Sequence, residues 1–176
     1  INRPSKEVGL LFKLFLTVLK NETKKLKDNN IKLVIIGDLS VFTPEIQNLA
    51  EKTQQLLQNN TGLNLVIAAN YGGQWDIAEA AKKIANKVVK GEISPQKIDK
   101  NVFGGHTSLA QFPKVDLLIR TSGEVRISNF LLWDIAYSEL YFCDTLWPDF
   151  DANDLDIAIK NFHSRDRRFG ERNGEK

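Results

Sequence analysis

Short apolar runs alternate with longer stretches of helical periodicity, and this alternation limits the fold more than any other feature of the sequence. Four runs predict strands, the first three of them buried, at residues 32–36, 63–69, 115–119 and 140–142. Strands that alternate with helices of this length are typical of a parallel sheet with helices on both faces. We therefore predict an α/β fold with an open, mostly parallel sheet flanked by helices, within one domain over residues 1–176.

The bulk composition indicates a soluble, globular protein. Of its 176 residues, 42% are hydrophobic and 26% are charged, so the chain can bury a core. The net charge of +2 argues against a dedicated nucleic-acid binder, which usually has a larger basic excess. The sequence has no apolar stretch of the roughly 18 residues that span a bilayer, and no signal-peptide pattern. We therefore expect a cytoplasmic protein.

Cysteine and methionine are both scarce. A single cysteine, Cys143, allows no internal disulfide and suits a reducing compartment, and its apolar neighbours predict a buried structural thiol. Methionine is absent, and the chain begins with Ile1. An intact translated protein begins with methionine, so we expect a processed chain, a fragment or a sequence whose start is missing.

The first predicted helix carries two apolar stripes. One stripe contains Val8, Phe12, Phe15, Leu16 and Leu19, and the other contains Leu10, Leu11, Leu14 and Val18. Such a helix is apolar over more of its surface than one packed face requires. It is either a central core helix, which is the plainer interpretation, or one wall of an apolar cavity.

Several polar residues predict helix ends. Thr43 and Pro44 form a good helix start, with a capping hydroxyl and proline at the first position. Asn129 is expected to cap a short helix. The acidic residues between 149 and 156 fail the spacing of a calcium-binding EF-hand loop, so Asp151 or Asn153 is better interpreted as a helix cap.

In open α/β sheets, ligands bind beyond the carboxyl ends of the strands. Three predicted loops lie there, at residues 37–40, 70–73 and 120–128. The third loop is the richest. Arg120 and Arg126 supply two guanidinium forks, and Ser128 and its neighbours supply hydroxyl and backbone donors, which together suit a phosphate or diphosphate. The alternative is a polar turn with two surface arginines.

Glu139 offers the hard oxygen ligand that Mg²⁺ prefers, although a lone glutamate before a strand is more often structural or solvated. The tail residues Arg165, Arg167 and Arg168 form either a solvated basic end or a contact to an anion or a partner.

Stretches along the whole chain, in order, resemble bacterial undecaprenyl diphosphate synthases, which are members of the cis-prenyltransferase family. These stretches are Asn2-Arg3-Pro4, IIGD at 35–38, LVIAANYGGQWDI at 65–77, DLLIRTSGEVRISNFLLWDIAYSELYF at 116–142, LWPDF at 146–150 and RDRRFG at 165–170. The block at 116–142 is long and highly specific.

The resemblance implies roles for individual residues. The residues that correspond to the family's site for the diphosphate of isopentenyl diphosphate are Arg120, Arg126, Ile127 and Ser128. Arg3 corresponds to a substrate-binding arginine at the end of a mobile loop, and Glu139 to a carboxylate linked to Mg²⁺. The segment Arg168-Phe169-Gly170 resembles a C-terminal motif that reaches the partner's active site in a dimer.

The implied activity is cis-prenyl chain elongation. Isopentenyl diphosphate condenses with an allylic, farnesyl-type diphosphate to build a long polyprenyl diphosphate, a lipid carrier of peptidoglycan synthesis. The resemblance further implies Mg²⁺ as cofactor, a homodimer, no nucleic-acid partner and peripheral membrane contact for product delivery. It also implies a hydrophobic tunnel beside the sheet, of which the double-striped first helix would form a wall.

Two departures from the family pattern limit these expectations. The N-terminal DGNGRWA-type motif with its metal-binding aspartate and the SSENW-type loop with its asparagine are absent, as if a strand, a helix and a strand were missing. No catalytic residue is therefore assigned within the chain, and we expect it to be inactive alone. In addition, Val125 stands where many bacterial relatives have histidine.

Two other interpretations stay open at this point. The chain could be the non-catalytic partner subunit of a two-component cis-prenyltransferase, since such subunits lack the N-terminal motif. It could also be a generic diphosphate-binding module.

Overall fold

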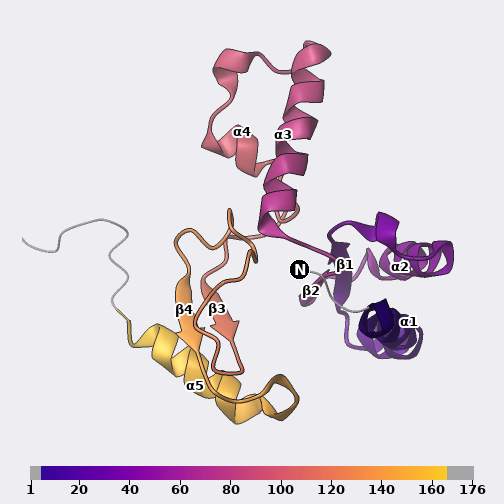
Figure 1. Cartoon of the computed structure of the whole chain (residues 1–176), viewed down its shortest axis with the longest axis vertical. Helices are drawn as coiled ribbons and strands as arrows, with labels where there is room; N and C mark the ends of the chain where they lie inside the picture. Colours follow the sequence, from indigo (N-terminus) through magenta and orange to yellow (C-terminus); the bar gives the residue numbers. More distant parts are fainter. Residues whose placement is uncertain (1–4, 166–176) are drawn as a thin grey trace, which may run out of the picture. The chain divides into compact units, whose positions relative to one another are not determined.

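A computed structural model describes residues 5–165 of the chain, with the backbone alone for residues 5–13 and Leu16. The chain divides into two compact units, Ile1–Tyr71 and Gly72–Lys176. Each unit combines one pair of parallel strands with helices (Figure 1), which confirms the predicted α/β class with parallel strands. The single domain, the joining of both pairs in one sheet and the tunnel stay predictions.

The first unit contains four elements in the order helix, strand, helix, strand. They are α1 (Ser5–Asp28), β1 (Lys32–Ile36), α2 (Pro44–Leu57) and β2 (Asn64–Ala68). The strands pair in parallel with Lys32 opposite Asn64 and Ile36 opposite Ala68. β1 has the predicted bounds, and β2 is one residue shorter than predicted at each end.

The core of the first unit lies between β1 and the two helices. Its buried members are Leu19 of α1, Leu33 and Ile35 of β1, and Ala50 and Leu57 of α2. The prediction that the second strand is buried is wrong, because every residue of β2 is exposed or half-buried. Within the described part of this unit, β2 pairs only with β1, and its faces are only partly covered.

The two stripes of α1 differ in burial. In the first stripe, Leu19 is buried and Phe15 packs against the core. In the second stripe, Leu14 is 60% exposed and Val18 is 40% exposed. Within its own unit α1 is therefore covered on one side only, and the central-core interpretation fails there. The described residues of the second stripe, Leu14 and Val18, are therefore apolar surface, and the role of the stripe as a tunnel wall stays a prediction.

The second unit contains three helices and two strands among its described residues. They are α3 (Gly73–Val89), α4 (Lys100–Gly104), β3 (Leu117–Arg120), β4 (Glu139–Phe142) and α5 (Ala152–His163). β3 and β4 pair in parallel, with Leu117 opposite Glu139 and Arg120 opposite Phe142. In Figure 1, α4 lies beside α3, and α5 lies beside the strand pair.

The predicted helix ends have mixed outcomes. The side chain of Asp151 accepts hydrogen bonds from the backbone N–H groups of Asn153 and Asp154, and Asp154 completes a capping box, so that cap is confirmed. Thr43 occupies the cap position of α2, but its hydroxyl makes no capping hydrogen bond. A 3₁₀ turn, Pro95–Lys97, precedes α4.

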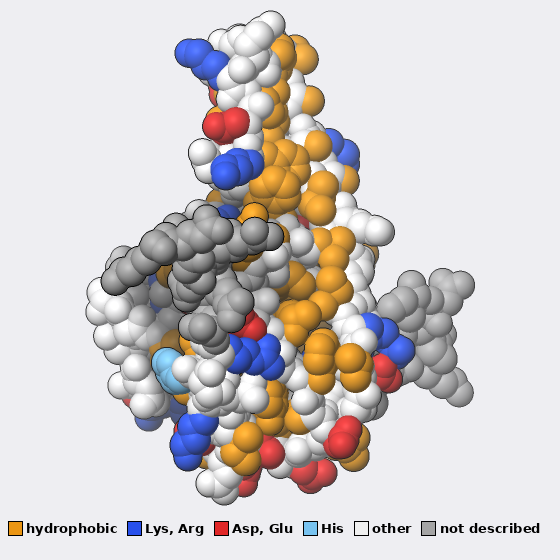
Figure 2. Space-filling view, turned by 90° about the vertical axis from the view of Figure 1, so that its left-hand side faces the viewer, with side chains coloured by type: hydrophobic (Ala, Val, Ile, Leu, Met, Phe, Trp, Pro, Cys, Tyr) orange, Lys and Arg blue, Asp and Glu red, His pale blue; other side chains and the backbone are white. Residues whose placement is uncertain are grey.

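Many apolar side chains remain on the surface. Figure 2 shows them in orange between the charged groups on the viewed face. The most exposed large apolar residues are Val89, Tyr137, Val125, Trp147 and Leu63.

Gly37 provides a test of the turn that follows β1. Its φ of +113° is a conformation that residues with side chains rarely adopt, and a Cβ atom there would overlap the carbonyl oxygen of Ala69. We predict that Gly37→Ala lowers the free energy of unfolding by about 2 kcal/mol or more, measured by urea denaturation. Gly91→Ala is the matched control, because Gly91 has φ +74° but no atom within 4 Å of its Cβ position, so the cost should be about 1 kcal/mol. Equal losses would contradict the steric explanation.

Candidate functional site

The loop of residues 120–131 leaves the carboxyl end of β3, which is where open α/β sheets bind their ligands. Arg120 is the last residue of the strand. Its Nη1 donates a hydrogen bond of 2.8 Å to Oγ of Ser128 and another to the carbonyl oxygen of Arg126. The fold therefore brings Arg120 and Ser128 together, as the sequence predicted for an anion-binding loop.

Arg126 does not join this contact through its side chain. Its Nη2 pairs with Oε2 of Glu124 at 2.5 Å, and the Arg126 side chain is 66% exposed. Ile127 is half-buried, and its carbonyl oxygen accepts a hydrogen bond from the N–H of Phe130. The loop thus holds one guanidinium group inward and presents the other to solvent.

Two backbone donors of the loop are already used. The N–H of Ser122 donates to the carbonyl oxygen of Thr145, and the N–H of Gly123 donates to that of Cys143. The expectation that these N–H groups are free for an anion is wrong, because they extend the pairing between the chain segments that follow β3 and β4. These two N–H groups are therefore not available to an anion.

The loop backbone is strained. The residues outside glycine with positive φ in this region are Ser122 (70°), Ser128 (44°), Asn129 (63°) and Leu131 (46°). Residues in sparsely populated backbone conformations persist only where their surroundings hold them, and they concentrate at functional sites. Here the surroundings include the hydrogen bond from Arg120 to Ser128.

Asn129 has a different role from the one predicted. Within the described residues no helix begins there, so the predicted cap of a following helix is wrong. Its Oδ1 accepts a hydrogen bond of 2.9 Å from the N–H of Gln74, and its carbonyl oxygen accepts one of 2.6 Å from Gly73. Asn129 therefore caps α3, which begins 56 residues earlier in the sequence at Gly73.

Glu139 lies at the other end of the strand pair. It is the first residue of β4, and it pairs with Leu117, three residues before Arg120. Three residues of strand span about 10 Å, so Glu139 and Arg120 occupy opposite edges of the pair. The carboxylate of Glu139 accepts a 2.7 Å hydrogen bond from Nη1 of Arg165, which makes an ion pair. The structure thus links Glu139 to the basic tail and not to the loop.

The residues around Glu139 can supply part of a Mg²⁺ site. The ion pair with Arg165 uses Oε2, and the other carboxylate oxygen accepts no hydrogen bond from the described residues. Those residues contain no group of three or more histidine, cysteine or acidic side chains placed to hold a metal ion. A single carboxylate can serve as one ligand of Mg²⁺ where water and substrate phosphates supply the other ligands. It cannot by itself form a site whose ligands all come from the protein.

The loops of the first unit satisfy their own polar groups. Asp38 accepts hydrogen bonds from Oγ and N–H of Ser40, and the hydroxyl contact is the larger cause that lowers the pKa of Asp38. Nδ2 of Asn70 donates to the carbonyl oxygen of Asp38 at 3.1 Å. Residues 37–40 and 70 therefore support each other locally through these hydrogen bonds.

Two buried acids were missed by the sequence analysis. Asp76 of α3 is 2% exposed and accepts hydrogen bonds from the N–H and the hydroxyl of Ser108. Asp134 is 8% exposed, and its Oδ2 has no hydrogen-bond partner among the described residues. Burial is the main cause that raises the pKa of Asp134; the charge of Asp76 adds to it, and Lys114 opposes it.

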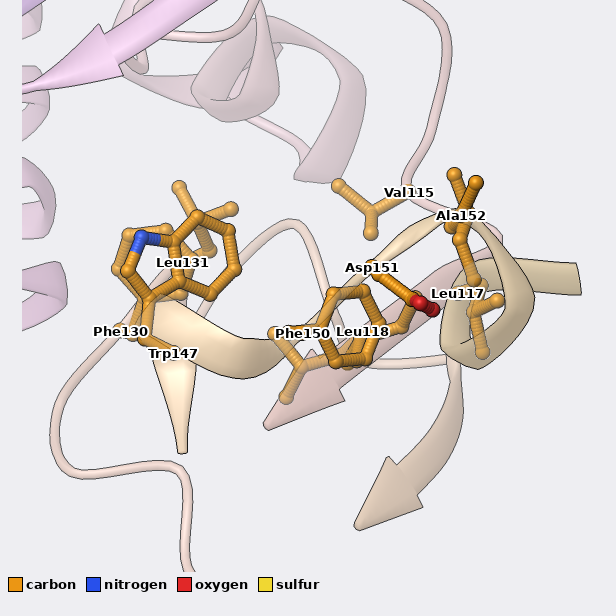
Figure 3. Close-up of a pocket in the computed structure, with 11 residues that line it drawn as sticks. Val115, Leu117, Leu118, Phe130, Leu131, Trp147, Phe150, Asp151 and Ala152 are labelled. Carbon is orange, nitrogen blue, oxygen red and sulfur yellow. The ribbon is translucent and has the colours of Figure 1, made fainter. Parts of the chain in front are cut away.

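An open apolar pocket lies beside the loop (Figure 3). Its volume is about 630 Å³, and its lining includes Ile119, which precedes Arg120, and Phe130, which follows Asn129. Of the lining residues, Asp151 alone is charged. The rings of Trp147 and Phe150 stack at 6.0 Å between centroids. Apolar surface therefore borders the loop of residues 120–131.

Comparison with known proteins decides the family. Residues 1–170 match the sequence profile described as "Putative undecaprenyl diphosphate synthase". The chain belongs to this prenyltransferase family. It is 53% identical over 168 residues to a ditrans,polycis-undecaprenyl-diphosphate synthase of Vibrio cholerae, covering 96% of this chain and 67% of that relative. The corresponding synthase of Escherichia coli K12 is 50% identical over 169 residues, with the same coverage.

Solved structures agree with the prenyltransferase assignment. Lavandulyl diphosphate synthase from Lavandula x intermedia, solved with dimethylallyl diphosphate, matches with a TM-score of 0.92 and 39% identity over 97% of this chain and 74% of that one. A "probable undecaprenyl diphosphate synthase" from Campylobacter jejuni matches with a TM-score of 0.85 and 30% identity over 96% and 77%. The resemblance and the enzyme class predicted from the sequence are confirmed.

Several predictions about this prenyltransferase concern its ends and surface. Arg3, Arg167 and the segment Arg168-Phe169-Gly170 lie outside the described residues. Val125 is 76% exposed. Cys143 is half-buried, so the prediction of a buried thiol is wrong. No helix in the described part of the chain is long and apolar enough to cross a membrane.

Asp134 gives a pH-dependent prediction. Because its pKa in the folded state is raised above the ordinary value of 3.8, the folded protein holds this proton more tightly than the unfolded chain does. The stability contribution of Asp134 therefore falls as the pH rises from about 4 through the raised pKa. We predict that Asp134→Asn stabilises the protein at pH 8 by about 1 kcal/mol and that the gain shrinks toward pH 4, measured by urea denaturation. A gain that is the same at both pH values would contradict an ionised, partnerless Asp134.

Proposed function

We propose that this chain carries the isopentenyl diphosphate site of a cis-prenyltransferase that elongates an allylic, farnesyl-type diphosphate into a long polyprenyl diphosphate. The observation that carries the proposal is the contact between Arg120 and Ser128 at the carboxyl end of β3. Support also comes from the relatives at 50–53% identity, whose names state specificity for (2E,6E)-farnesyl diphosphate.

The geometry of the loop suits a diphosphate. Arg120 uses only Nη1 in its contacts to Ser128 and Arg126, so the remaining N–H groups of this guanidinium can donate to phosphate oxygens. Arg126 can leave its exposed pair with Glu124 at little cost, because exposed ion pairs contribute about 0–1 kcal/mol. Closure of Arg126 onto the ligand would complete a two-arginine clamp with Ile127 and Ser128 between its ends.

In the proposed reaction the allylic carbon–oxygen bond breaks and diphosphate leaves. The double bond of isopentenyl diphosphate forms the new carbon–carbon bond at that carbon, and loss of a proton then leaves a cis double bond. The part of this chain is to hold isopentenyl diphosphate in place and to orient its double bond. No described residue is assigned to the proton transfer.

We include Mg²⁺ as the cofactor and Glu139 as the residue of this chain that would contact it. When bound, Mg²⁺ would neutralise charge on the diphosphate groups. Because Glu139 and Arg120 lie at opposite edges of the strand pair, the proposal places them in separate parts of the assembled site. A homodimer, a cytoplasmic location and peripheral membrane contact for product delivery in cell-wall lipid synthesis also belong to the proposal.

The first test concerns Arg120 in the protein encoded by the complete reading frame. Arg120→Ala removes a charge-assisted contact, which contributes about 1.5 kcal/mol or more. We therefore expect kcat/KM for isopentenyl diphosphate to fall about tenfold or more. Arg126→Ala removes the other arm of the proposed clamp and should lower the same kcat/KM by a similar factor, because its exposed pair with Glu124 costs little to break. Steady-state kinetics with each substrate varied in turn measure the effect. Unchanged constants for Arg120→Ala would remove it from the site.

The second test separates two roles of Glu139. If Glu139 acts on the metal, Glu139→Ala raises the Mg²⁺ concentration needed for half-maximal activity, whereas Arg165→Ala leaves that concentration unchanged or lower, because it frees the carboxylate. Mg²⁺ titrations of the parent and both variants provide the measurement. If both variants shift the titration alike, Glu139 serves only to anchor Arg165 and the metal role is wrong.

A further inference from the structure

The turn at Ser128 and Asn129 is held from two directions. On one side, Arg120 donates to Oγ of Ser128. On the other side, Asn129 accepts hydrogen bonds from Gly73 and Gln74, the first two residues of α3. All five residues lie in the second unit. The candidate anion loop is thereby tied to a helix that is distant in the sequence.

The helix and the turn approach each other too closely for side chains at two positions. A Cβ atom on Gly72 would lie 2.7 Å from Nδ2 and 3.7 Å from Cγ of Asn129, and apart from its chain neighbours no other described residue has an atom within 4 Å of that Cβ position. A Cβ atom on Gly73 would lie 2.6 Å from Cγ of Leu132. The glycine pair at the start of α3 therefore leaves room for the turn that follows Ser128.

Asparagine suits this position for two reasons. Asn129 has φ +63°, a left-handed conformation that asparagine tolerates better than most residues. Its side-chain oxygen also satisfies one of the N–H groups that every helix start leaves without an intrahelical partner. The first two N–H groups of α3 are thus used to hold the loop, so the positive end of this helix contacts the loop instead of a phosphate.

We propose that Asn129 is a positioning residue, which holds the left-handed turn against α3 so that Ser128 stays at Arg120 and the loop is preformed for isopentenyl diphosphate. This inference rests on the function proposed above and adds a residue that acts through Ser128 without touching the substrate. Preformation lowers the cost of ordering the loop on binding, so its loss weakens binding of the ligand that the loop holds.

The test uses Asn129→Ala and Asn129→Gly in the protein encoded by the complete reading frame. Asn129→Gly keeps the left-handed backbone and loses the side-chain acceptor, whereas Asn129→Ala loses both. We expect Asn129→Ala to raise KM for isopentenyl diphosphate about fivefold or more, from the usual effect of a lost cap, and Asn129→Gly to raise it less. KM for the allylic diphosphate should stay at the parent value.

Gly72→Ala adds a sharper test through a double-mutant cycle. In the parent, the new methyl group displaces the Asn129 side chain and should raise the same KM. In the Asn129→Gly background the side chain that the methyl group meets is gone, so Gly72→Ala should change little. This non-additivity is specific to contact between the two residues. Additive effects would overturn the inference.

Hydrogen exchange needs no substrate, so it tests the positioning role of Asn129 separately from the proposed function of the loop. Amide hydrogen exchange at Gln74 should accelerate in Asn129→Ala and stay slow in Asn129→Asp, which keeps an acceptor oxygen. Faster exchange at Gln74 with an unchanged KM for isopentenyl diphosphate would overturn the positioning role alone. If Arg120→Ala also leaves that KM unchanged, the proposed function of the loop falls with it. Urea denaturation of each variant shows whether a change in KM reflects loss of the fold.

Discussion

The hydrogen bond between Arg120 and Ser128 is the contact on which the candidate site depends. β3 ends at Arg120, and the parallel pairing with β4 fixes where that end lies. From there the chain turns through positive φ values at Ser122 and Ser128. Without a contact that returns the loop to the strand end, these strained residues would relax to commoner conformations. One guanidinium group thus organises the loop and still has donors left for an anion.

Strain in the loop is supported from neighbouring elements. The N–H groups of Ser122 and Gly123 are bonded to the segment after β4, and Asn129 is bonded to the start of α3. The loop is therefore connected to both sides of the unit that contains it. Such a frame is suited to rigid recognition of a small anion, since little conformational entropy remains to be lost when the ligand binds.

Periodicity predicted the elements well because it reports local chain geometry. β1 has the predicted bounds, and Asp151 caps α5 as expected. Burial was predicted less well, because it depends on what covers a face. β2 is as apolar as β1 in sequence and yet is partly exposed in its unit. In α3 the buried positions are Gly73, Asp76, Ala80 and Ile84, so the buried side of this helix includes an acid. An acid at a buried helix position gives no periodic signal, which is why Asp76 was missed.

Glu139 lies in the same sequence block as Arg120, yet the structure places the two residues at opposite edges of the strand pair. Its place before an apolar run already put it at the amino end of a strand, and ligands of such sheets gather at the carboxyl ends. In the register of β3 and β4, Glu139 lies opposite Leu117, three residues of strand before Arg120. The ion pair with Arg165 adds a structural reason for the carboxylate that a list of motifs does not contain.

The sequence by itself determined the α/β class, the family and the residue types of the anion loop, because hydrophobic period and a specific block of residues are local properties of the chain. Tertiary structure decided which donors are free, which acids are buried and what Asn129 caps. Those outcomes depend on contacts between segments tens of residues apart, such as Asn129 with Gln74 and Asp76 with Ser108. Hydrogen bonds of this kind form only where the fold places donor and acceptor within about 3 Å, and no local pattern encodes that distance.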